Sequence, residues 1–313
     1  MRKSFFISLL VALPFVLNAQ SSGLPLLGIA PTAFELSRAE ASGATPVGAA
    51  SVYSNPALLI NSPTTTLDLS YTNWIADANN VFGGINLVNE KRAIAFSFYT
   101  SGITGLEQRN NPGPSNGDFS IQYLAISAGY AHDFSLFELG VSGHYLNEEV
   151  YPYRARGYAF NAGISRSFTN DRFTVGASVQ NIGEMENLDQ QATDLPKKIT
   201  FGASGSLFEY RHHKNPTLPV KISAAVDYIV PIIDNQNISR INFNAPEAFL
   251  NTALSFLVAD VIQINAGYKT GNNVRPVSFG LGFITEKVIF NYANIPFNTG
   301  YGTVHSIGIQ YQL

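Results

Sequence analysis

The chain lacks cysteine, carries little charge and has no apolar run long enough for a membrane-spanning helix. Without cysteine among its 313 residues, neither a disulfide framework nor a thiolate metal site stabilises the fold. Charged residues make up 13% of the chain, about half of the usual share. The formal net charge is −3, and the absence of a basic block argues against nucleic acid as a partner. We expect no cofactor and no metal.

Residues 1–19 have the composition of a secretory signal peptide. Arg2 and Lys3 form the charged start, an apolar stretch runs from Phe5 to Val16, and cleavage is expected between Ala19 and Gln20. The apolar stretch is about a dozen residues long, which is too short to span a membrane as a helix. Because no later run approaches that length, a membrane role has to come from strands.

Apolar and polar residues alternate repeatedly between residues 64 and 313. Leu67, Leu69 and Tyr71, for example, are separated by Asp68 and Ser70. This period of two places the apolar side chains on one face of a strand. About fourteen strands are expected, at residues 64–73, 80–88, 92–100, 118–132, 134–148, 156–168, 172–182, 197–208, 218–231, 247–258, 260–270, 275–284, 286–294 and 301–313.

The connections between these strands are short and long in turn. Tight polar turns such as Asn89-Glu90-Lys91 alternate with longer loops such as Glu184–Leu195, as in outer-membrane barrels with short periplasmic turns and long external loops. A soluble β-sandwich is the alternative, but its strands average about five or six residues. Aromatic residues also gather near strand ends, as in interfacial girdles. The sequence therefore predicts an all-β fold, a transmembrane antiparallel β-barrel of about 14 strands in the outer membrane, surrounded by lipid.

Residues 20–63 do not alternate and are rich in Ala, Gly and Ser. A short helix is expected around Thr32–Ala41, with Thr32 as its N-cap. Since a fourteen-stranded barrel is wider than one that side chains alone can fill, we expect this segment to fold inward as a plug. The expected organisation is a signal peptide (1–19), a plug or hatch segment (20–63) and the barrel (64–313).

Short motifs spread over most of the chain follow one another in a characteristic order. They are Ser37-Arg38-Ala39-Glu40-Ala41-Ser42-Gly43-Ala44, Ser54-Asn55-Pro56-Ala57-Leu58-Leu59, Gly157-Tyr158-Ala159-Phe160-Asn161, Val179-Gln180-Asn181-Ile182-Gly183, Asp194-Leu195-Pro196, Ile264-Asn265-Ala266-Gly267-Tyr268, Phe279-Gly280-Leu281-Gly282 and Gly302-Thr303-Val304-His305-Ser306-Ile307. Together they resemble FadL-like outer-membrane proteins, and most closely the PorV/PorQ family of the Bacteroidetes lineage. Two positions depart from that pattern: Asn291 stands where the family usually has Asp, and Gly43-Ala44 replaces a fuller Gly-Gly-Ala turn.

The motif residues have mainly structural roles in this interpretation. Arg38, Gly43, Asn55 and Pro56 are expected at the junction between plug and wall, where Asn55-Pro56 fixes a turn. Glycines on strands, such as Gly267, would let the plug backbone approach closely. Ligand gating is the alternative role for both sets.

Two further groups of residues are candidates for chemistry or binding. A hydrolase could use His144 with Ser142, and His212-His213 could suggest a metal, but neither has the remaining partners and we expect no enzyme. At the external loop, Tyr151, Tyr153 and Arg154 form an aromatic and charged cluster that could contact a partner. A solvated loop is the alternative for that cluster.

Two functions follow from these observations. The resemblance implies a non-enzymatic component of type IX protein secretion or surface attachment, in which PorV-like members escort secreted cargo and PorQ-like members anchor a surface complex. The expected partners are then secreted cargo proteins or subunits of the secretion complex. The alternative is a FadL-like transporter whose partner is a hydrophobic small molecule.

Overall fold

The computed structural model describes residues 24–109, 113–168, 172–189, 194–212, 215–232 and 248–313, with backbone alone for 211–212 and 215–218. The expected signal peptide and the centres of the loops at 110–112 and 235–246 lie outside the described residues. Within the described part, no helix is both long enough and apolar enough to cross a membrane.

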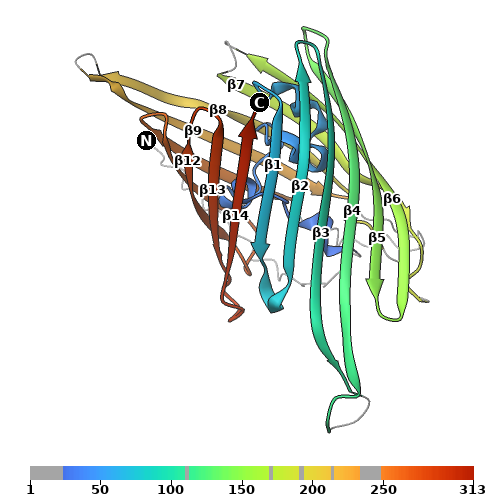
Figure 1. The fold of residues 1–313 in the computed structure, drawn as a ribbon. Coiled ribbons are helices and arrows are strands. Elements are labelled where there is room, and N and C mark those ends of the chain that lie inside the picture. Colours follow the sequence, from blue (N-terminus) through green and yellow to red (C-terminus); the bar gives the residue numbers. More distant parts are fainter. Residues whose placement is uncertain (1–23, 110–112, 169–171, 190–193, 213–214, 233–247) are drawn as a thin grey trace, which may run out of the picture.

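Fourteen antiparallel strands in the described residues close into a barrel, in which each strand pairs with its neighbours in sequence and β14 returns to β1 (Figure 1). The strands are β1 Thr66–Asn73, β2 Asn79–Asn89, β3 Arg92–Gln108, β4 Gly117–Asp133, β5 Glu138–Val150, β6 Tyr153–Phe168, β7 Phe173–Met185, β8 Lys198–His212, β9 Asn215–Pro231, β10 Phe249–Val258, β11 Ile262–Lys269, β12 Val277–Ile284, β13 Val288–Pro296 and β14 Thr303–Gln312. The predicted fold class is confirmed.

The alternation of the sequence becomes the two faces of the wall. In β1 the burial pattern is strictly alternating, with Leu67, Leu69 and Tyr71 exposed and Asp68 and Ser70 buried. A ring of exposed large apolar side chains on the outside and small polar side chains on the inside is the reverse of a water-soluble barrel. It is the arrangement of barrels whose outer face meets lipid.

The two rims of the barrel differ. One rim carries the start of β1, the end of β14 and short connections such as the one between Asn89 and Arg92; in outer-membrane barrels this rim is periplasmic. Two hairpins extend further than the sequence suggested. β3 continues to Gln108 and lengthens the external hairpin with β4, and β8 continues to His212, so that residues 206–212 pair only with β9 (Figure 1).

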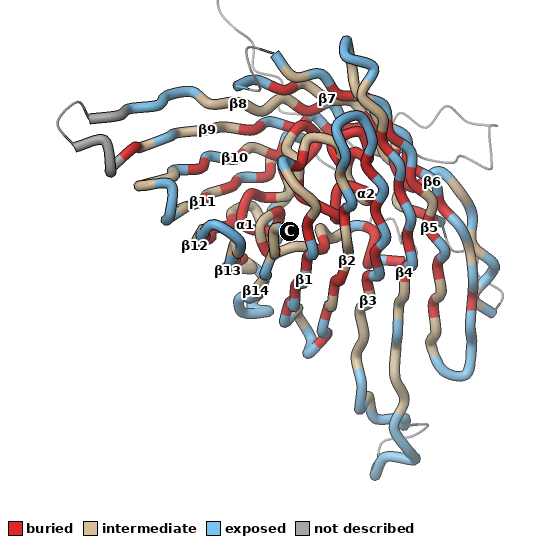
Figure 2. The backbone as a smooth tube through the Cα atoms, turned by 45° about the horizontal axis from the view of Figure 1, so that its top comes forward, coloured by how far each residue is buried: buried red, intermediate tan, exposed pale blue. Residues whose placement is uncertain are grey.

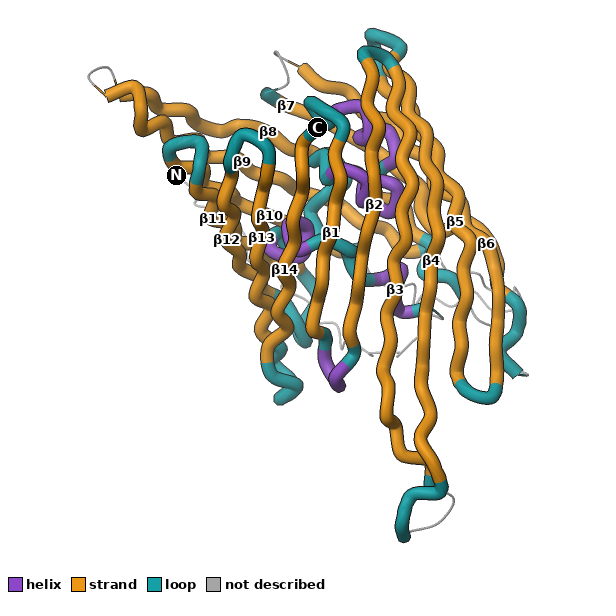
Figure 3. Tube along the Cα trace, viewed as in Figure 1, coloured by secondary structure: helices purple, strands orange, loops and turns teal. Residues whose placement is uncertain are grey.

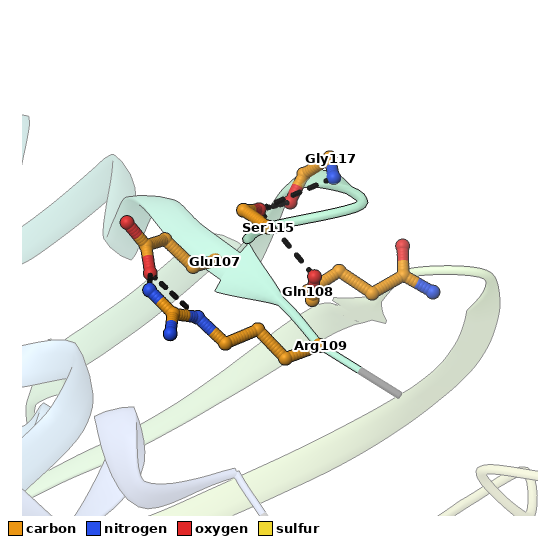
Figure 4. A network of polar contacts seen from close by, with 5 residues as sticks. All are labelled: Glu107, Gln108, Arg109, Ser115 and Gly117. Atoms are coloured by element: carbon orange, nitrogen blue, oxygen red, sulfur yellow. Dashed lines mark hydrogen bonds and ion pairs between the residues drawn. The ribbon is translucent and has the colours of Figure 1, made fainter. Parts of the chain in front are cut away.

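A small polar network closes the described part of the long external hairpin between β3 and β4. Arg109 pairs with Glu107, and Ser115 donates to the carbonyl oxygens of Gln108 and Gly117 (Figure 4). These side chains are exposed, so the network organises the hairpin tip and contributes little to the stability of the barrel.

Residues 24–63 form five short helices that lie against the inner face of the barrel (Figures 2 and 3). They are η1 Pro25–Gly28, α1 Ala33–Ser37, η2 Gly48–Ala50, α2 Ser51–Ser54 and η3 Pro56–Asn61; a further turn, η4 Ile75–Asp77, follows β1. The predicted N-cap is confirmed, since the Thr32 side chain accepts a hydrogen bond from the Glu35 amide. The predicted end of that helix was wrong, because Ala39 and Glu40 have φ of 51° and 61° and leave the helical region.

Candidate functional site

The candidate site is the region where residues 24–63, here called the N-terminal segment, meet the inner wall. Where the wall comes closest to the segment, the wall residues are glycines, which have no side chain. A Cβ on Gly140 of β5 would lie 2.3 Å from the Ala57 nitrogen, and one on Gly267 of β11 would lie 2.4 Å from the Ala39 nitrogen. Glycine at these positions therefore allows backbone to pack on backbone.

Three of the four junction residues predicted from the sequence meet in the structure. The Asn55 amide donates to the carbonyl oxygens of Gly43 at 2.9 Å and Ile164 at 3.3 Å, and its oxygen caps η3 by accepting from the Ala57 amide. Pro56 occupies the first turn of η3, where its missing amide hydrogen costs nothing. Asn55 thus joins two parts of the segment to β6.

Gly43 also attaches the segment to a second strand of the wall, β9. Its amide donates to the Asp227 carboxylate of β9 at 2.7 Å, and Asp227 is buried. A similar contact occurs at Ala49, whose amide donates to Asp68 of β1 at 2.7 Å. Two inward carboxylates therefore accept hydrogen bonds from backbone amides of the segment.

Arg38, the fourth predicted junction residue, lies apart from these contacts. Its guanidinium stacks over the Phe34 ring at 4.9 Å and donates to Thr45 at 3.4 Å. Burial lowers the pKa of Arg38 to about 10, against the opposing effect of the Asp227 and Glu35 charges. Arg38 also lines a polar cavity of about 540 Å³ between the segment and the periplasmic ends of β5 to β9, together with Arg172 and Lys221.

Burial also changes the pKa of Glu35, one turn before Arg38. It raises this pKa from 4.5 to about 7, although hydrogen bonds from Thr32 and Ser42 lower it in part. The Glu35 carboxyl is therefore the group of the segment that gains or loses a proton near neutral pH.

An ion-pair cluster at Glu40 holds the middle of the segment. Its carboxylate lies 2.5 Å from Lys269 Nζ of β11 and 2.7 Å from Arg275 Nη1, in the external loop after β11. The Arg275 guanidinium in turn lies 5.1 Å from the centre of the Trp74 ring, which packs edge-on against Phe297. Burial alone would raise the pKa of Glu40, but the positive charges of Arg275 and Lys269 and their hydrogen bonds outweigh it and lower this pKa.

The Glu40 cluster was missed at the level of sequence. Glu40 lies within the motif Ser37–Ala44, but its two partners follow more than 220 residues later in the chain. One signal in the sequence could have indicated a partner: Glu40 is a charged residue in an Ala- and Ser-rich segment that is expected to be buried inside the barrel, and buried charges are usually paired.

Apolar side chains fill the external half of the lumen. The buried members of this cluster come from the segment, from the strands and from the loop before β8; they are Leu24, Leu26, Leu27, Val47, Ala49, Ala50, Phe82, Tyr99, Ala125, Leu146, Ala159 and Leu195. The rings of Tyr53, Phe82 and Tyr99 meet edge-to-face with centroids 5.8–6.2 Å apart. The cluster extends from the external loops to the middle of the barrel, and side chains of the segment are part of it.

Among the described residues, His144 contacts two serines and an aromatic ring and has no carboxylate partner. Its ring nitrogens lie 2.7 Å from Ser127 Oγ and 3.2 Å from Ser142 Oγ, and the Tyr53 ring stacks on it. The Ser142 hydroxyl donates to the Val52 carbonyl oxygen at 2.7 Å, so this hydroxyl is engaged in holding the segment. No group of three potential metal ligands occurs among the described residues, and the side chains of His212-His213 lie outside them.

The predicted external cluster lies at the tip of the hairpin between β5 and β6. Tyr151 and Tyr153 are exposed, and Arg154 pairs with Glu149 at 2.8 Å. Because both tyrosine rings face solvent, this tip is accessible, and its role in partner contact stays a prediction.

No family model matches the sequence, and no curated protein matches it. The fold is similar to solved outer-membrane structures at 11–12% identity. The CymD monoaromatic hydrocarbon channel has a TM-score of 0.58, with 92% of this chain and 98% of that one covered. The Pseudomonas putida toluene transporter TodX has a TM-score of 0.57, covering 90% and 97%. A Pseudomonas aeruginosa FadL homologue has 0.55, covering 90% and 98%. The chain therefore has the closed barrel fold of FadL-like outer-membrane proteins, which supports an outer-membrane location.

Proposed function

We propose that this protein is an outer-membrane transporter for hydrophobic small molecules, with the N-terminal segment as its plug. The observation that carries the proposal is the similarity of nearly the whole chain to solved hydrocarbon transporters and channels. The interior described above supports it, because a segment attached by hydrogen bonds and ion pairs can detach without disturbing the barrel.

The apolar cluster is the proposed entry path. A hydrophobic molecule that replaced Leu24 and Leu26 beside Phe82 and Tyr99 would bury its surface at about 25 cal/mol per Å². Aromatic rings at the path favour aromatic molecules, since ring pairs contribute about 0.5–1.5 kcal/mol beyond their buried area. The segment must move for passage to continue, because its contacts with β1, β6 and β9 place it across the lumen on the far side of the path.

The role in type IX secretion, which the sequence resemblance implied, has no support from the comparisons. Two of the similar solved structures are a monoaromatic hydrocarbon channel and a toluene transporter, and they favour the alternative function. A secretion role also needs a surface for cargo, and the exposed hairpin tip at Tyr151 does not identify one.

A deletion strain complemented with the wild-type gene tests the proposal. Initial uptake of radiolabelled toluene and of hexadecane should fall in the deletion strain and return on complementation, while the secreted proteins stay unchanged. Unchanged uptake of both compounds, together with secreted proteins trapped in the periplasm, would exclude transport and restore the secretion role.

A further inference from the structure

The outer face of the barrel contains an apolar groove of about 720 Å³ that crosses β1, β2 and β11 to β14. This volume lies within the range of about 300–1,000 Å³ that is typical of small-molecule sites. The groove is separate from the lumen, because it is bounded by outward side chains and by the outer backbone surface of the residues at its floor.

Strand register explains the form of the groove. Its floor is a row of paired residues that point inward and leave only backbone outside; they are Gly282, Asn291, Gly308, Ser70 and Phe82. Its periplasmic side is the outward row Phe283, Phe290, Ile309 and Leu69, and its external side is the outward row Leu281, Tyr292, Ile307, Tyr71 and Val81.

Directly beyond the external side, the next outward row is polar in four of its five members. These register partners are Phe279, Asn294, His305, Asn73 and Asn79. Two tyrosines of the groove reach up to the row: Tyr71 donates to Asn79 Oδ1 at 2.6 Å, and Tyr292 Oη lies 2.8 Å from His305 Nδ1.

Two side chains of this polar row have no hydrogen-bond partner among the described residues. The side chains of Asn73 and Asn294 make no hydrogen bond to any described residue. A neutral row of amides and an imidazole next to an apolar groove matches a molecule with a hydrocarbon part and an uncharged hydrogen-bonding part.

We propose that the groove and the polar row together bind an acylated glycolipid of the outer leaflet. An acyl chain would lie along Leu281, Phe290 and Ile307, and sugar hydroxyls or amides would meet Asn73, Asn294 and His305. The occupant comes from the membrane because both rows face outward, and from the outer leaflet because the polar row lies toward the external end of β1 and β14. A phosphate headgroup is disfavoured, since phosphates are bound mainly by Arg and Lys and the row contains neither.

Photo-crosslinking in native outer-membrane vesicles tests this site. A photoreactive phenylalanine analogue replaces Leu281 in the groove, and in a matched variant it replaces Phe160, which is equally outward and exposed on β6. The acylated glycolipid should crosslink much more at position 281 than at position 160. In the variant with the photoreactive residue at position 281, N294L combined with H305L should lower that yield roughly tenfold, because the glycolipid loses two neutral hydrogen bonds.

Asn147→Leu, which removes an outward asparagine of β5, should leave the crosslinking yield at position 281 unchanged. Heat-modifiable migration in gels shows that each variant has folded. Equal crosslinking at positions 281 and 160, or phospholipid or a protein as the main adduct at 281, would overturn the proposal. Each of these results leaves the transport proposal untouched, since uptake is measured separately.

Discussion

The Glu40 carboxylate of the N-terminal segment lies 2.7 Å from the Arg275 guanidinium of the loop between β11 and β12. This pair connects the interior of the barrel to its external surface. The same carboxylate also binds Lys269, so one residue of the segment pairs with two largely buried cations. Release of the segment therefore has to separate charges that are largely shielded from water.

Glu40→Gln should loosen the segment strongly. The substitution leaves Lys269 and Arg275 without their anion, and loss of one partner of a buried ion pair costs about 3–5 kcal/mol. Hydrogen exchange of the amides in residues 24–63, measured in lipid nanodiscs, should accelerate accordingly. Glu107→Gln removes an exposed pair and is the control, with little change expected. Exchange as slow as in the wild type would show that Glu40 does not hold the segment.

The N-terminal segment can lie inside the barrel, as in the structure (seated), or be released from the wall. The free energy that favours the seated segment should fall as the pH rises from about 4.5 to about 7. Seating raises the pKa of Glu35 to about 7 because burial favours its neutral form, so the released segment loses its proton at lower pH than the seated one. Glu35→Gln should therefore stabilise the seated segment at pH 8 by on the order of 3 kcal/mol and have little effect at pH 4. Hydrogen exchange of residues 32–43 between pH 4 and 8 measures this, and a pH-independent difference would refute it.

Asn55→Ala should destabilise the segment by about 1–3 kcal/mol, because the Ala57 amide and the Gly43 carbonyl lose their partner inside the barrel. Asn61→Ala is the matched control, since Asn61 is half-buried and, among the described residues, donates only to Ser167 at 3.2 Å. Limited proteolysis in mild detergent should cleave the Asn55 variant within residues 24–63 well before the control. Cleavage at equal rates would contradict the role of Asn55.

Gly140→Val should prevent the segment from seating, because any side chain at this position overlaps the backbone of Pro56 and Ala57. Gly143→Val on the same strand is the control, as its Cβ would meet only the Phe160 ring at an ordinary 3.5 Å. Single-channel recordings in planar bilayers should show porin-like conductance for the first variant and near-background conductance for the second, since a barrel of this width is open when unfilled. Background conductance in both would mean that the segment does not close the lumen.

The barrel could be predicted from the sequence because its signal is local. Alternation at Leu67, Leu69 and Tyr71 identifies a strand and its outward face without knowledge of any other strand. The same holds for Thr32, whose capping role depends on a residue only three positions later. The predicted ranges of β3 and β8 were too short. The parts of these strands that project beyond the barrel wall need no apolar face, so their sequence does not show the alternation that identifies a strand.

Contacts that depend on closure of the barrel could not be predicted. Asn55 and Gly43 were recognisable from their motifs, but the partners Ile164 and Asp227 are fixed by strand register. The pairing of Glu40 with Arg275 and the outer groove likewise arise only when β14 meets β1 or when the segment lies inside. The sequence contains these residues, and the fold decides which of them meet.

The most direct test of the transport proposal is to lock the segment to the wall and measure uptake. A Cβ on Gly308 of β14 would lie 3.3 Å from the Ala33 Cβ, close to the separation of about 3.5–4.5 Å found in disulfides. The chain has no other cysteine, so A33C with G308C can form one defined crosslink. The single-cysteine variants are the controls. Initial toluene uptake by cells with the oxidised double variant should fall to the level of the deletion strain and recover with reductant. Uptake that stays at the wild-type level while the crosslink is complete would contradict a mobile plug and the transport route through it.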